Sequence, residues 1–141
     1  MVVRLLPLPG ETIRQRMIGY HLILHRLRLQ LGDLSHFVTM AQVIVSSSHL
    51  FDAGFGNARI EGLAEAHEAL ERSLRASVET GVWGIDQSTF ELFADLLILH
   101  EDQLSKAPLH AVINSTKTGE SSNADMLRRR DAEDGLVARP V

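Results

Sequence analysis

The stretch from Leu34 to Phe51, LSHFVTMAQVIVSSSHLF, contains no charged residue, although 23% of the chain is charged. Asp33 directly precedes this stretch and is predicted to cap a helix there, while Gly54 follows it and supplies a stop. Because apolar positions recur at steps of three and four on more than one side, we expect a central helix with several neighbours and a deeply buried Ile44. Its main face consists of Leu34, Phe37, Ala41, Ile44, Ser48 and Phe51.

The composition favours a single soluble domain that is rich in helix. At 141 residues the chain is long enough for one hydrophobic core, and it is poor in aromatic residues. The polar residues of the central stretch, such as His36 and Gln42, would be costly in a membrane, so we expect no transmembrane segment. The chain has no cysteine, and its first residues, MVVRLLPLPG, lack the features of a signal peptide, so we expect a cytoplasmic location.

Periodic apolar positions predict three more long helices, over residues 11–31, 58–80 and 88–103. Ser88 and Glu91 form the sequence pattern of a capping box at the start of the last one. A shorter fifth helix is expected over residues 108–115, with Ser105 as its cap. The predicted fold is therefore all-α, a four- to five-helix antiparallel bundle with a disordered C-terminal tail. The predicted parts are an extended N-terminal segment (residues 1–10), the bundle (11–117) and the tail (118–141).

The first and fourth predicted helices carry more apolar surface than one neighbour can cover. Each has a second apolar stripe, beside Met17 and Leu24 in the first helix and beside Phe93 and Leu97 in the fourth. At least one stripe should face water in a monomer, so we expect a homodimer, or a complex with a host protein, through these helices. The alternative is that residues 1–9 and the fifth helix fold back over the spare stripe. The predicted interface residues are Ile18, Leu22, Leu29, Leu92, Leu96 and Leu99.

Charge is distributed unevenly along the chain. Residues 1–32 carry five arginines and one acid, whereas residues 33–104 carry twelve acids and three arginines. The basic first helix and an arginine triplet in the tail suggest an alternative function, a nucleic-acid-associated transcriptional regulator. The residues of this alternative are Arg14, Arg16, Arg26, Arg28, Arg128, Arg129 and Arg130.

The seven histidines do not fall into a metal-binding pattern. None of them follows a Glu by three residues, and neither His67 nor His100 belongs to a complete zinc motif. His21 and His25 lie four residues apart but lack a matched set of further ligands, so we expect no metal and no cofactor. His67 and His100 lie on apolar seams and are expected to be hydrogen-bonded core residues.

The serine triplet, Ser46 to Ser48, has no adjacent base and no nucleophile elbow. These small residues are expected to allow neighbouring helices to approach closely. No paired carboxylates and no phosphate-binding loop occur elsewhere in the chain, so we expect a protein that is not an enzyme.

Three short segments resemble a known family: residues 51–56 (FDAGFG), 81–86 (GVWGID) and 99–104 (LHEDQL). Over residues 30–105 the chain resembles small all-helical proteins from proteobacterial phages, plasmids and genomic islands, some of which are labelled Fis-type regulators. The serine triplet departs from the family pattern, and no C-terminal helix-turn-helix supports the Fis label. The resemblance implies an all-α fold and a mobile-element context, and it supplies no catalytic residues. We therefore expect a non-enzymatic protein-interaction or regulatory protein.

Overall fold

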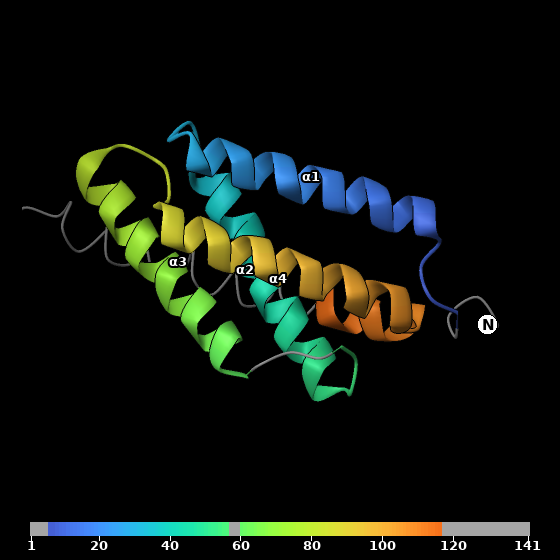
Figure 1. Cartoon of the computed structure of the whole chain (residues 1–141). Coiled ribbons are helices and arrows are strands. Elements are labelled where there is room, and N and C mark those ends of the chain that lie inside the picture. The colour runs from blue at the N-terminus through green and yellow to red at the C-terminus, as the bar shows by residue number, and fades with distance from the viewer. Residues whose placement is uncertain (1–5, 57–59, 117–141) are drawn as a thin grey trace, which may run out of the picture.

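The computed structural model describes residues 6–56 and 60–116, which form an all-α bundle (Figure 1). Its long helices are α1 (Gly10–Arg28), α2 (Leu34–Asp52), α3 (Ile60–Thr80) and α4 (Gln87–Lys106), and a shorter helix covers residues 109–116. Within the described residues no strand occurs, and Pro7 and Pro108 form only an isolated bridge. The predicted fold class is confirmed. The predicted tail, residues 118–141, lies outside the described residues.

Helix α2, which contains the uncharged stretch Leu34–Phe51, is a central helix of the bundle. It contacts each of the other three long helices, and α4 crosses in front of it in Figure 1. Phe37, Met40 and Leu50 on α2 are fully buried at 0% exposure, and Ile44 is buried at 5%. The central position predicted for this stretch and the burial of Ile44 are therefore correct.

Helix α1 ends at Arg28, earlier than the predicted Leu31. Gln30 adopts a left-handed conformation with φ of 63°. The N–H of Leu31 donates to the carbonyl of Arg26 at 3.0 Å, and the N–H of Gln30 donates to that of Leu27 at 3.1 Å, which is a Schellman ending. The side chain of Gln30 stabilises this strained backbone conformation, because its Nε2 donates to the carbonyl of Ile85 at 2.8 Å.

Helix α2 begins with the predicted cap. The Asp33 carboxylate accepts from the N–H of His36 at 3.3 Å, and the N–H of Asp33 donates to His36 Nδ1 at 3.0 Å. This is a capping box with a histidine in the place where glutamate or glutamine is usual. The hydrogen bond from the Ser35 hydroxyl, the largest effect, and the one from the backbone N–H of His36 lower the pKa of Asp33, since both stabilise the ionised carboxylate.

Helix α4 begins one residue before the predicted Ser88, and its cap is Asp86. The Asp86 carboxylate accepts from the N–H of Thr89 at 2.8 Å. Ser88 lies inside the helix, and its hydroxyl donates to Asp86 at 3.0 Å, so the predicted Ser88 capping box is wrong. The hydrogen bonds from Thr89, the largest effect, and from Ser88 lower the pKa of Asp86.

Asp86→Ala is expected to lower the free energy of unfolding by about 1 kcal/mol, because it removes the acceptor for a terminal N–H of α4. Ser88→Ala is the matched control and should change stability by less than about 0.5 kcal/mol, since Ser88 bonds only to the cap. Urea unfolding followed by circular dichroism measures both values. A larger loss for Ser88→Ala than for Asp86→Ala would contradict this assignment of the cap.

The fifth helix follows Pro108, and Ser105 is not its cap. Ser105 lies in the last turn of α4, where its hydroxyl donates to the carbonyl of Asp102 at 2.7 Å. The helix is held from two sides. The N–H of Leu109 donates to the carbonyl of Leu6 at 2.8 Å, and the Ser46 hydroxyl donates to Ser115 Oγ at 2.8 Å.

Polar side chains join α2 to α4 inside the core. Ser47 Oγ and His100 Nδ1 are hydrogen-bonded at 3.0 Å, and Gln103 Nε2 donates to the carbonyl of Ser47 at 2.8 Å. The ring of Tyr20 on α1 lies 5.9 Å from that of His100. Gln103 Oε1 is buried without a hydrogen-bond partner. His100 is therefore the hydrogen-bonded core histidine that was predicted, and the serines act as hydrogen-bonding groups as well as small residues.

His67 is exposed, so the prediction that it belongs to the core is wrong. Its Nε2 lies 3.5 Å from a carboxylate oxygen of Glu71, and both side chains are in contact with solvent. The buried seam of α3 passes instead through Leu63, Ala66 and Leu70, which are 8%, 1% and 5% exposed. Ala66 lies on this seam, and His67 faces outward because successive residues are about 100° apart around a helix.

Candidate interaction surface

Helix α1 has one buried and one exposed apolar face. Met17 and Leu24 face the core, at 4% and 1% exposure. Ile18, Leu22 and Leu29 are 53%, 61% and 53% exposed, although all three are large aliphatic residues. The second stripe predicted on the first helix is therefore present and uncovered within the described part of the chain.

The alternative covering of this stripe does not occur in the described residues. The N-terminal segment pairs with the start of the fifth helix, through the Pro7–Pro108 bridge and the bond from Leu109 to Leu6. Residues 6–9 therefore lie at the end of the bundle, and Ile18 and Leu22 keep more than half of their surface exposed.

The stripe predicted on the fourth helix is not an exposed surface. Leu96 is buried at 4%, and Leu92 and Leu99 are half-buried against the core. The physical reason is that α4 packs against α1, α2 and α3, which together cover both of its apolar stripes. The prediction of Leu96 as an interface residue is therefore wrong, whereas the half-buried Leu92 and Leu99 stay predictions.

The exposed apolar residue of α4 is Ile98, which the sequence reading missed. At 66% it is the most exposed of the large hydrophobic residues described. A signal for it exists in the sequence, because Ile98 continues the outer seam of Glu91, Asp95 and Asp102 at steps of three and four. A hydrophobic residue on an otherwise acidic seam points away from the core.

Helices α1 and α4 lie side by side and run in opposite directions (Figure 1). The guanidinium of Arg28 lies 4.6 Å from the centre of the Phe90 ring, and Arg14 lines a shallow hollow with Ile98 and Glu101. The exposed residues of the two helices thus form one surface, which we term the α1/α4 face. It includes Arg14, Ile18, Leu22, Arg28 and Leu29 on the α1 side and Glu91, Asp95, Ile98 and Glu101 on the α4 side.

The α1/α4 face carries opposite charges on its two halves. Arg14 and Arg28 belong to the α1 half, and Glu91, Asp95 and Glu101 to the α4 half. Among the described residues no ion pair joins α1 to α4. These charges are therefore available to a partner with a complementary pattern.

The arginines of the nucleic-acid alternative do not form a single row. Arg14, Arg16, Arg26 and Arg28 are all exposed, but they point to different sides of α1. Arg28 stacks on Phe90, and Arg16 is close enough to Tyr20 to oppose the rise in the pKa of that phenol that burial causes. Arg128, Arg129 and Arg130 lie outside the described residues, so this alternative stays a prediction.

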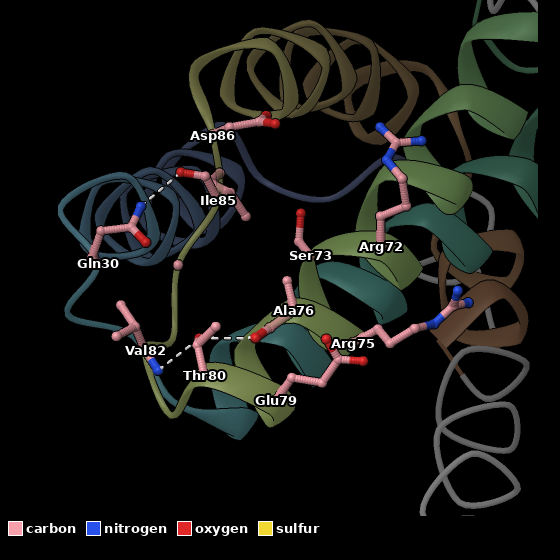
Figure 2. Close-up of a pocket in the computed structure, with 11 residues that line it drawn as sticks. Gln30, Arg72, Ser73, Arg75, Ala76, Glu79, Thr80, Val82, Ile85 and Asp86 are labelled. Carbon is pink, nitrogen blue, oxygen red and sulfur yellow. Dashed lines mark hydrogen bonds between the residues drawn. The ribbon is translucent and has the colours of Figure 1, made fainter.

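A groove of about 530 Å³ separates α3 from the loop that leads into α4 (Figure 2). Gln30 closes one side, with its amide directed at the carbonyl of Ile85. Arg72, Arg75 and Asp86 are on its walls. Because cationic and anionic side chains share the walls, the groove favours neither an anion nor a cation.

The groups suited to chemistry are either dispersed or enclosed. Residues 6–56 and 60–116 contain no group of three or more His, Asp or Glu side chains that could hold a metal ion. Ser47 and His100 form a nucleophile–base contact, but they are only 0% and 2% exposed, so a substrate has no access to them. The pair therefore has a structural role.

The sequence was compared with models of protein families, with curated proteins and with solved structures, and none of them matched. The resemblance to small phage and plasmid proteins accordingly stays a prediction. None of the helices in the described ranges is both long and apolar enough to span a membrane.

Proposed function

We propose that the chain is a non-enzymatic protein-interaction module with a regulatory role, and that the α1/α4 face is its binding surface. The observation that supports this proposal is the exposure of Ile18, Leu22 and Leu29 on a helix whose opposite face is in the core. Soluble proteins rarely leave several large aliphatic residues of one helix face in water unless that face serves an interaction. The mobile-element context implied by the sequence resemblance and a cytoplasmic location belong to the same proposal.

The energetics favour a moderate affinity. Fully burying an aliphatic side chain contributes about 1.5–3 kcal/mol, and the side chains of Ile18, Leu22, Leu29 and Ile98 are already partly covered. Their combined contribution is of the same order as the 4–15 kcal/mol or so that association costs in lost freedom of motion. Charge complementarity on the same face is therefore needed for specific binding.

Leu22→Glu is expected to reduce the capture of specific partners at least about tenfold, which corresponds to about 1.4 kcal/mol. The tagged chain is incubated with a lysate of cells that encode it, and each retained protein, including untagged copies of the chain, is quantified by mass spectrometry. Leu31→Glu is the matched control, because Leu31 is as exposed as Leu22 (61% each) but lies beyond the end of α1.

The comparison between variants decides the outcome. Proteins lost with Leu22→Glu and kept with Leu31→Glu support a binding surface on α1. Equal capture by the unchanged chain and by both variants would remove the α1/α4 face as the binding surface. Circular dichroism spectra that match the unchanged chain show that each variant is folded.

A further inference from the structure

We propose that the partner at the α1/α4 face is a second copy of this chain, related by a two-fold axis that places α1 of each copy on α4 of the other. This inference rests on the proposed function and names the partner of the same surface. The axis runs parallel to the helices, above the groove between α1 and α4. Because α1 and α4 are antiparallel within one copy, α1 of the partner subunit also lies antiparallel to the α4 that it covers.

The contacts within one copy determine which residues meet. Arg14 is beside Ile98, Glu101 and Asp102, and Arg28 is beside Phe90. Both helices rise by the same distance per residue, so Ile18 and Ile98, which stand between these two points, lie at about the same level, that is, the same position along the helix axes. A rotation about an axis parallel to the helices leaves these levels unchanged. Ile18 of each copy therefore lies over Ile98 of the partner subunit, which covers the most exposed apolar side chain.

The charges select this arrangement over a direct α1–α1 contact. With α1 on α4 of the partner subunit, Arg14 comes to the level of Glu101, and Arg28 comes to the level of Glu91. Cations thus meet acids near both ends of the interface. A pairing of α1 with α1 would oppose two helices that each carry four arginines and a single glutamate, so like charges would face each other.

The size of the face is sufficient for a specific dimer, with little to spare. Helix α1 has 19 residues and is about 28 Å long, and two neighbouring helices are about 20 Å wide. The footprint is therefore about 560 Å² on each copy, or about 1,100 Å² in total, close to the lower bound of about 1,000 Å² for specific interfaces. We therefore expect a dimer that dissociates at low micromolar concentration.

Cross-linking through single introduced cysteines tests this geometry, since the chain itself contains no cysteine. Ile18→Cys and Ile98→Cys are prepared as separate proteins, and both sites are exposed, so folding is expected to be retained. A short bismaleimide is added to each protein alone and to their mixture at high micromolar concentration. The control is Ile98→Cys mixed with Val78→Cys, because Val78 is 51% exposed but lies on α3. Linked dimers are counted on denaturing gels.

The mixture of Ile18→Cys and Ile98→Cys is expected to yield linked dimers in up to half of the chains, and several-fold more than either protein alone or the control. Linking by Ile18→Cys alone would overturn the proposal in favour of an α1–α1 contact. Light scattering is recorded in parallel on the unchanged chain. A mass near 15.6 kDa at every concentration would exclude a second copy, although the capture experiment would still test the face for another partner. A doubled mass without linking in the mixture would refute the two-fold arrangement.

Discussion

Leu96→Glu is expected to unfold most of the domain, with a loss of more than about 5 kcal/mol in the free energy of unfolding. Leu96 is only 4% exposed, so its replacement removes the packing of a buried leucine, and truncation of such a leucine to alanine costs about 2–5 kcal/mol. The new carboxylate would also be buried without a cationic partner, which costs several kcal/mol more or raises its pKa. Since small domains are stable by about 5–15 kcal/mol, this sum approaches the whole stability. Circular dichroism and urea unfolding measure the result.

Leu22→Glu is the matched comparison, because it is the same chemical change on the other helix of the α1/α4 face. Leu22 is 61% exposed, so the glutamate stays in water and the stability of the monomer should change by less than about 0.5 kcal/mol. Leu96→Ala separates the cavity from the charge and should lie between the two variants. A Leu96→Glu protein as stable as Leu22→Glu would mean that the second stripe of α4 is exposed after all.

Lowering the pH from 6.5 to 4 is expected to destabilise the protein by about 3 kcal/mol through His100 alone. Burial lowers the pKa of His100 from its ordinary value of 6.5 to about 4; the Gln103 side chain raises it, and Arg16 lowers it. Between these two pH values the unfolded chain binds a proton that the folded chain does not. The free energy of unfolding therefore falls by about 1.4 kcal/mol for each pH unit in this window and is independent of His100 above it.

His100→Gln provides the control for the pH experiment, because the amide cannot titrate. This variant is less stable at neutral pH, since it loses the bond to Ser47, but its stability should change much less between pH 6.5 and 4. The lowered pKa values of Asp33 and Asp86 stabilise the folded chain above their ordinary pKa of 3.8, and this stabilisation is lost as the pH falls below 3.8, outside this window. Urea unfolding at several pH values gives both curves, and parallel curves for the two proteins would rule out His100 as the titrating group.

The sequence predicts well those features that depend on local rules. Asp33 caps α2 because a short acidic side chain before an apolar run accepts the first free N–H groups, whatever surrounds it. The end of α1 could not be predicted in this way. The strained backbone of Gln30 is stabilised by a hydrogen bond from its side chain to the carbonyl of Ile85, 55 positions away in the sequence. A local sequence pattern cannot predict a bond between residues so far apart. Gly32, which follows the predicted helix over residues 11–31, also has a long-range partner, because its N–H donates to the carbonyl of Trp83 at 2.9 Å.

The candidate surface was predicted on one helix and missed on the other for a related reason. Helix α1 lies at the outside of the bundle, so its second stripe, Ile18 and Leu22, remains in water. Helix α4 has a similar pattern but packs against three helices, which cover Leu96 and leave Ile98 outside. The number of helices that pack against a given helix depends on the whole fold. The spacing of apolar residues within that helix does not predict this number.

The contact between the α1–α2 loop and the α3–α4 loop contains a natural fluorescent probe, Trp83. Trp83 is the only tryptophan, its ring lies 5.8 Å from that of Phe37, and its carbonyl holds the turn between α1 and α2. Intrinsic fluorescence is therefore a local signal that reports the contact of the α3–α4 loop with the start of α2. Circular dichroism, by contrast, averages over all the helices. A comparison of the two signals during unfolding therefore shows whether this contact is lost together with the rest of the bundle, and it requires no added label.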